Sequence, residues 1–145
     1  MRRELADRYE LDDDRARVDL DAVWDFLSTD AYWGRERSRA TVEAQVRDAA
    51  RVVGLYREGR QVGFARVVSD GRIAYLADVY VVREHRGRGL GVELVRAAVD
   101  DGPHRDLGWL LHTRDAHALY ARFGFGPPSE RLLERPSRWP GSNRR

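Results

Sequence analysis

The chain of 145 residues is long enough for one domain with its own core, and 26 basic against 24 acidic residues leave a net charge of only +2. The absence of cysteine excludes disulfides, thiolate metal sites and cysteine nucleophiles. No stretch approaches the ~18 consecutive apolar residues of a membrane helix, and the charged start lacks the apolar segment of a signal peptide, so we expect a cytoplasmic protein. We predict a single domain over residues 1–136 and a flexible tail over residues 137–145.

The first third of the chain predicts two helices. Residues 8–18 are ambiguous, because apolar residues there permit a strand whereas three consecutive aspartates favour a turn. After Asp19, which can cap a helix, apolar residues recur at helical spacing, and Ser38 can begin a second helix in the same way. Between the two helices, Tyr32 and Trp33 stand in a predicted loop. They either pack over a helix end or line a pocket for the substrate.

The middle of the chain predicts three strands that follow one another as hairpins. Strands are expected over residues 51–56, 61–68 and 73–82, and the two connections contain Glu-Gly and Asp-Gly pairs that favour tight turns. The last of the three strands is the longest and the most apolar.

The last third of the chain returns to alternating helices and strands. We predict a helix over residues 89–100, a buried strand over 107–112, a helix over 116–123 that Asp115 can cap, and a final strand over 131–134. The whole order predicts an α/β (α+β) domain, in which helices cover both faces of a mixed sheet.

The turn over residues 86–91 joins the longest strand to the helix that follows it. It consists of Arg86, Gly87, Arg88, Gly89, Leu90 and Gly91. A glycine-rich turn that opens a helix directs several backbone N–H groups and the positive end of the helix dipole at one point, which favours a phosphate. The chain contains no lysine, which excludes a Walker A loop, and the glycine spacing does not fit a dinucleotide fingerprint. The pattern R-x-x-G-x-G does fit.

Three segments resemble the GNAT superfamily of acetyl-CoA-dependent N-acyltransferases. DVYVVREHRGRGLGVELV is similar to the acyl-CoA motif, LYARFGF to the motif LYxxxGF, and YREGRQVGFARVV to the hairpin before the central strand. The resemblance covers roughly residues 50–126. It implies a GNAT-like, mostly antiparallel central sheet with a splayed central strand.

The resemblance also implies where the cofactor binds. Backbone N–H groups of residues 86–91 would hold the pyrophosphate of acetyl-CoA, and the backbone of Val79, Tyr80 and Val81 would pair with the pantetheine arm. A bulge in that strand would open the gap for the thioester. Asp115 stands in the region where the family often has an asparagine that contacts the cofactor.

The reaction needs a proton acceptor for the amine and a donor for the leaving thiolate. The resemblance implies that Tyr120 donates to the thiolate; without the motif, the sequence favours a core tyrosine packed beside Leu119 and Phe123. Asp78, the single acid in its apolar run, is the candidate base or else a salt-bridged strand residue. His112 and His117 are either structural residues or proton relays, and a free backbone N–H near Val81 would stabilise the oxyanion.

These inferences predict an N-acetyltransferase that moves an acetyl group from acetyl-CoA to a primary amine of a small molecule or peptide. The alternative is a non-catalytic acyl-CoA-binding module of the same fold. We expect no metal and no membrane partner. A nucleic-acid-binding domain is a third hypothesis, which the interspersed acidic residues disfavour. The sequence identifies neither the acceptor amine nor whether the chain forms a homodimer.

Overall fold

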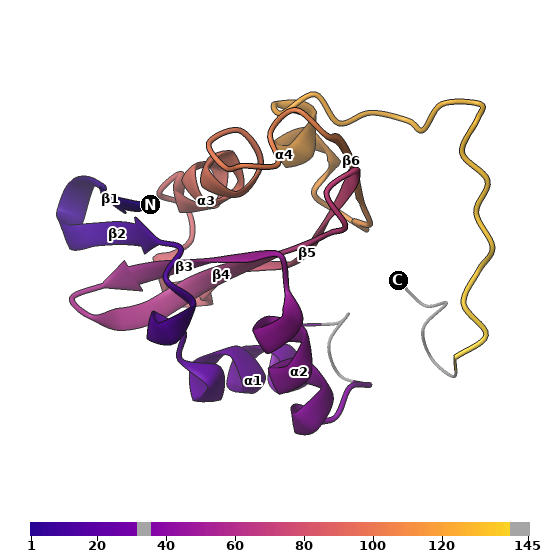
Figure 1. Cartoon of the computed structure of the whole chain (residues 1–145). Coiled ribbons are helices and arrows are strands. Elements are labelled where there is room, and N and C mark those ends of the chain that lie inside the picture. The colour runs from indigo at the N-terminus through magenta and orange to yellow at the C-terminus, as the bar shows by residue number, and fades with distance from the viewer. Residues whose placement is uncertain (32–35, 140–145) are drawn as a thin grey trace.

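The computed structural model describes residues 1–31 and 36–139, which form a six-stranded sheet between two layers of helices (Figure 1). The strands follow the order β1-β2-β3-β4-β5-β6, and every neighbouring pair is antiparallel except β5 and β6. The elements are β1 (Arg2–Glu4), β2 (Tyr9–Asp12), α1 (Leu20–Thr29), α2 (Arg39–Asp48), β3 (Arg51–Arg57), β4 (Arg60–Ser69), β5 (Ile73–Val81), α3 (Leu90–Val99), β6 (Gly108–Leu111) and α4 (His117–Ala121). The predicted fold class is confirmed.

The first two helices begin where their capping residues predict. The Asp19 carboxylate accepts a hydrogen bond from Ala22 N at 3.1 Å, and the Ser38 hydroxyl accepts one from Thr41 N at 3.1 Å. The ambiguous residues 8–18 divide into strand β2 and a polar turn. In that turn the Asp14 carboxylate accepts from Ala16 N at 3.0 Å.

Two predictions near the C-terminus are wrong. Asp115 does not cap α4, because Ala116 occupies the cap position and its N–H donates to the Thr113 hydroxyl at 3.0 Å. Residues 126–139 contain no strand and run away from the body of the domain (Figure 1), so the expected strand over 131–134 does not form. Pro127 and Pro128 have no N–H to donate, and a short apolar run without a pairing partner does not make a strand. Most of the predicted tail, residues 140–145, lies outside the described residues.

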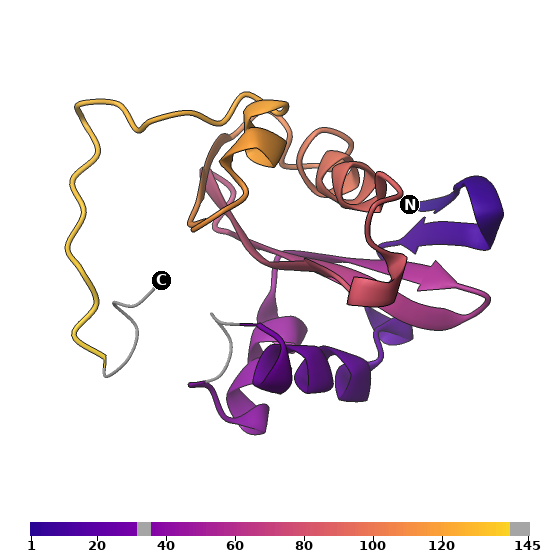
Figure 2. The ribbon, with the colours of Figure 1, turned by 180° about the vertical axis from the view of Figure 1, so that it is seen from behind.

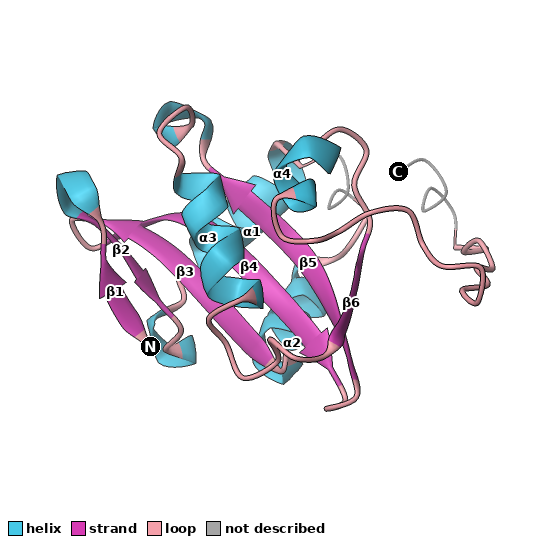
Figure 3. Cartoon of the chain, turned by 90° about the horizontal axis from the view of Figure 1, so that it is seen from above, coloured by secondary structure: helices cyan, strands magenta, loops and turns pink. Residues whose placement is uncertain are grey.

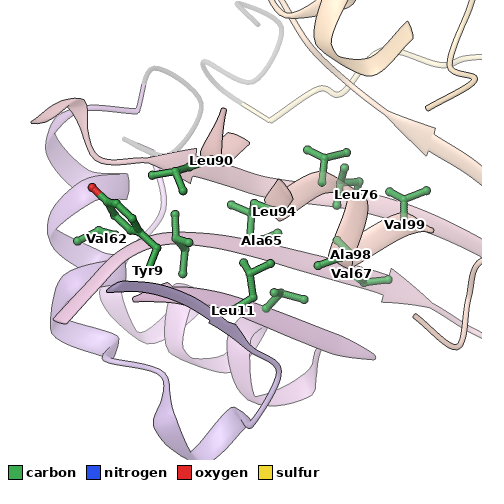
Figure 4. Close-up of a cluster of buried hydrophobic side chains, with 14 of the residues drawn as sticks. Tyr9, Leu11, Val62, Ala65, Val67, Leu76, Leu90, Leu94, Ala98 and Val99 are labelled. Carbon is green, nitrogen blue, oxygen red and sulfur yellow. The ribbon is translucent and has the colours of Figure 1, made fainter. Parts of the chain in front are cut away.

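Helices cover both faces of the sheet (Figures 2 and 3). Helix α3 packs on one face, in a cluster of buried residues that includes Leu76, Leu90 and Leu94 (Figure 4); we call it the α3 cluster. Helices α1 and α2 pack on the other face in a second cluster that includes Phe26 and Tyr80, here called the α1/α2 cluster. None of the described helices is both long and apolar enough to cross a membrane.

Candidate active site

The centre of strand β5 contains a bulge. Its pairing with β4 passes from Phe64 opposite Tyr80 to Arg66 opposite Ala77, so β5 has one residue more than β4 across this stretch. Asp78 lies in the bulge with φ of 53°, in the left-handed region that Asp tolerates better than most residues.

The bulge also changes which face of the sheet the side chains reach. Leu76 and Val79 both pack into the α3 cluster although they are three residues apart, where a regular strand repeats every two. Tyr80 then faces the opposite side and stacks on Phe26, with ring centroids 3.9 Å apart. Burial raises the pKa of Tyr80, so its phenol stays neutral.

Strand β5 separates from β6 next to this bulge. The two strands pair only from Ile73 opposite Gly108 to Leu76 opposite Leu111, and β5 then continues for five more residues. The backbone of residues 77–81 that faces the β6 side therefore has no strand partner within the described part of the chain. This is the splayed central strand that the resemblance implies.

A cleft of about 270 Å³ lies at this opening. It brings together five of the residues selected from the sequence: Asp78, Val79, His112, Asp115 and Tyr120. Tyr120 packs against the α3 cluster, whereas Arg37 and Gln45, which also line the cleft, come from the α2 side of the sheet. The cleft therefore extends to both faces of the sheet.

Asp78 is held by two arginines, Arg66 on β4 and Arg37 just before α2. Arg37 donates from Nη1 and Nη2 to the two carboxylate oxygens at 3.0 and 2.8 Å, and Arg66 donates from Nε at 2.9 Å. Burial alone would raise the pKa of Asp78, but the hydrogen bonds and charges of Arg37 and Arg66 outweigh it and hold the pKa below its ordinary value. A carboxylate in this state is a weaker base than a free one.

The sequence reasoning missed both of these arginines. Arg66 has a signal in retrospect, because it is the single charged residue inside the apolar run of strand β4. Arg37 precedes α2 in the polar connection between two helices, and nothing local distinguishes it from the neighbouring arginines.

His112 and Tyr75 form a second pair of side chains at the cleft. The Tyr75 hydroxyl and His112 Nδ1 lie 2.5 Å apart, and both residues line the cleft. His117 is exposed at the start of α4 and does not line it. Of the two histidines that the sequence offered as proton relays, the structure therefore places one at the cleft.

Tyr120 is positioned by the turn that ends α4. Gly124 has φ of 85° and reverses the chain, after which Phe125 N donates to the Tyr120 carbonyl at 3.3 Å. The two rings meet edge to face with centroids 5.9 Å apart. This packing explains why Leu-Tyr and Gly-Phe occur together in one motif, since the second pair supports the ring of the first.

The glycine-rich turn lies where β5 passes into α3. Gly87 and Gly89 both have positive φ, at 80° and 76°, and Gly89 caps α3 without any side chain that accepts from the first turn. A Cβ atom at either glycine would meet no protein atom within 4 Å, so the space in front of the helix start is open. Arg86 donates from Nε to the Val81 carbonyl at 2.8 Å, which engages one of the backbone groups expected to pair with pantetheine.

A bulged and splayed strand, a glycine-rich turn and an open helix start thus occur in one continuous segment. A sequence model of the acetyltransferase (GNAT) family matches residues 20–125. The chain belongs to the GNAT family. The resemblance drawn from its motifs is confirmed.

This GNAT domain is similar in sequence or in structure to the following three proteins. A Gibberella zeae protein, provisionally described as an acetyltransferase, is 31% identical over 116 residues; the match covers 72% of this chain but only 60% of the fungal protein. A Xanthomonas campestris structure, provisionally assigned to an acetyltransferase of the GNAT family, is 37% identical with a TM-score of 0.83, covering 94% of this chain and 97% of that one. A predicted acetyltransferase with acetyl-CoA, from Clostridium acetobutylicum, shares the fold at 14% identity and a TM-score of 0.61, covering 93% of this chain and 96% of that one.

Part of the predicted site of this GNAT domain is not among the described residues. Tyr32 and Trp33, the residues expected to contact the acceptor, lie outside the described residues.

Proposed function

We propose that this chain is an acetyl-CoA-dependent N-acetyltransferase that acetylates a primary amine of a small molecule or peptide. The observation that carries the proposal is the splay of β5 from β6, which opens a cleft next to Tyr120 and leads along β5 to the start of α3. Membership of the GNAT family supports acetyl transfer, and the Clostridium relative is a precedent for acetyl-CoA on this fold.

The glycine-rich turn suits the pyrophosphate of acetyl-CoA. The N–H groups of the first turn of α3 and the positive end of its dipole point to the same place, and glycine at position 89 lets phosphate oxygens come close. Arg88 is exposed beside this point and can add a charged hydrogen bond. We assign cofactor binding to residues 86–91 on these grounds.

The second half of β5 suits the pantetheine arm. Within the described residues, the edge of this half that faces β6 has no strand partner, so it can offer N–H and C=O groups to an extended ligand, as in the addition of a further strand. Val79 and Tyr80 remain the main candidates, since the Val81 carbonyl is engaged by Arg86. Asp115 lines the same cleft and stays a proposed contact of the cofactor.

Two groups of the chain would act on the carbonyl oxygen and the leaving sulfur. As the amine nitrogen attacks the thioester carbon, a C–N bond forms and the C–S bond breaks, and a backbone N–H at residues 79–81 would stabilise the negative charge on the carbonyl oxygen. The Tyr120 hydroxyl would donate its proton to the leaving sulfur. A phenol keeps its proton at neutral pH, as this role requires.

The proton of the amine needs an acceptor. The sequence offered Asp78, but its lowered pKa and its two arginine partners make it a weak base. His112 lines the same cleft and is oriented by Tyr75, so we assign the proton to His112, directly or through water. Asp78 then has the task of fixing the bulge.

The test is a thiol-release assay with acetyl-CoA over polyamines, amino acids, aminoglycosides and peptides, with mass spectrometry of the product. We expect one amine class to release thiol in proportion to N-acetylated product. The chain has no lysine, so acetylation of its own side-chain amines cannot contribute to the signal. Binding of acetyl-CoA without turnover of any amine would favour the non-catalytic module, and failure to bind acetyl-CoA would overturn both hypotheses.

A further inference from the structure

Two largely buried arginines share the Asp78 carboxylate in the floor of the cleft. The side chains of Arg37 and Arg66 are 16% and 11% exposed, and that of Asp78 is 5% exposed. A buried charge without a partner is costly, so buried cations are normally matched by anions. Among the described residues that line the cleft, three arginines face two aspartates, the other two residues being Arg114 and Asp115.

The two guanidinium groups have donors that Asp78 does not use. Arg66 donates only from Nε, and neither of its Nη atoms forms a hydrogen bond with a described residue. Arg37 donates from Nη1 to both Asp78 and Gln45, and from Nη2 to Asp78 through one of its two N–H bonds. The buried Nε of Arg37 has no hydrogen-bond partner in the described part of the chain. The unused Nε and Nη2 hydrogens of Arg37 lie on one edge of the guanidinium, in the fork geometry that matches a carboxylate or phosphate.

Gln45 adds to this set of donors. Its side-chain oxygen accepts from Arg37 Nη1 at 2.6 Å, which leaves the amide NH₂ as the group still able to bind a ligand. The α2 side of the cleft therefore offers mostly donors and an excess of positive charge. An amine alone would be repelled there, whereas an anion would be attracted.

We propose that the acceptor carries an anionic group, a carboxylate or a phosphate, in addition to its amine, and that Arg66 and Arg37 bind this group. The inference rests on the proposed acetyl transfer and names the class of its acceptor. The anion binds Arg66 and Arg37, and the amine points toward His112 and Tyr120, which line the same cleft. A cavity of about 270 Å³ fits a group the size of an amino acid.

Matched acceptors test the proposal. One arm compares an amino acid with its amide and its decarboxylated amine, for example phenylalanine, phenylalaninamide and phenethylamine, over a set of side chains. A second arm compares O-phosphoethanolamine with ethanolamine and so separates phosphate from carboxylate. The amide is an informative control, because its amine loses a proton more easily than that of the acid. A preference for the acid therefore cannot come from the amine itself.

We expect the anionic member of the best set to exceed its neutral partners in kcat/KM by about tenfold to a hundredfold, the range for a charged hydrogen bond. In Arg66→Gln the ratio of anionic to neutral acceptor should fall to about one, while Arg66→Lys should retain part of it. Arg60→Gln, an exposed arginine on the same strand, is the matched control and should leave the ratio unchanged.

A binding measurement keeps the test independent of turnover and of a misfolded variant. In the presence of coenzyme A, calorimetry should show that the N-acetylated acid or phosphate binds the wild-type chain more tightly than the N-acetylated neutral amine, and that Arg66→Lys narrows the difference. Neutral acceptors that react as well as anionic ones would overturn the inference and leave acetyl transfer intact. No turnover of any amine, with acetylated anions and neutral compounds binding equally, would overturn both.

Discussion

Replacement of Asp78 separates the charge of this residue from its backbone conformation. Asp78→Asn removes the charge but keeps a side chain that tolerates the left-handed region. Asp78→Gly removes the side chain and eases the backbone, and Asp78→Ala removes the side chain while leaving the backbone at φ of 53°. Asp78→Asn therefore tests the arginine clamp, that is, the ion pairs of Asp78 with Arg37 and Arg66. Comparison of Asp78→Ala with Asp78→Gly tests the backbone conformation of the bulge.

The structure gives the size of each effect. Asp78→Asn leaves Arg37 and Arg66 without their carboxylate, and loss of one partner from a buried ion pair costs about 3–5 kcal/mol of unfolding free energy. Asp78→Ala should be less stable than Asp78→Gly by about 1 kcal/mol, the cost of a Cβ in the left-handed region. Urea unfolding of the three variants and the wild-type chain at pH 7 measures these differences.

The pH dependence has a definite sign. The pKa of Asp78 is lower in the folded chain than its ordinary value of 3.8, so the stabilisation is fully present above that pH and is lost as the pH falls through the folded value. The difference in unfolding free energy between the wild-type chain and Asp78→Asn should therefore be largest near pH 7 and shrink below about pH 4. If Asp78→Asn unfolds within about 1 kcal/mol of the wild-type chain at pH 7, the clamp does not stabilise the fold.

Three further substitutions test other parts of the structure. Tyr120→Phe should lower kcat about 10²-fold while calorimetry still detects acetyl-CoA binding, because the variant loses only a proton donor; unchanged turnover of the best amine would remove Tyr120 from the mechanism. Gly89→Val should abolish acetyl-CoA binding, because the side chain would enter the open space before α3 from a backbone with φ of 76°; retained affinity in a folded variant would contradict the assignment of the turn. Arg51→Met should lower the unfolding free energy by about 2–4 kcal/mol in urea, since Arg51 Nη1 donates to the buried carbonyls of Ala97 and Ala98 at 2.8 and 3.3 Å. Wild-type stability of that variant would show that these carbonyls find other donors.

Helices and strands were predicted well where residues that are close in the sequence determine them. Asp19 and Ser38 accept hydrogen bonds from the first turns of α1 and α2, as capping residues do in any helix of this kind. The prediction of a strand over residues 131–134 failed because a short apolar run does not show whether a neighbouring strand exists to pair with it. The prediction of Asp115 as a cap failed because α4 begins one residue later, after Ala116, whose N–H donates to the Thr113 hydroxyl.

The site was predictable only in part, for the same reason. The glycine-rich turn and Tyr120 belong to contiguous motifs, so the family resemblance could point to them. Arg37 and Arg66 meet Asp78 from separate elements, 41 and 12 residues away in the chain, and no periodicity records that meeting. An alternating strand also predicts Leu76 and Tyr80 on one face, whereas the bulge puts them on opposite faces.

Because of the bulge, the number of residues in β5 determines which face of the sheet its later side chains reach. Its extra residue lets Val79 continue the face of Leu76 and sends Tyr80 to the other side. Deleting one residue from the stretch Ala77 to Val79 would remove the bulge, and the regular strand that results would keep Tyr80 and Val81 on their present faces. A deletion elsewhere in β5 would instead reverse the side chains on one side of the deleted position. In a deletion scan of this strand, folding should therefore be disturbed least at the bulge.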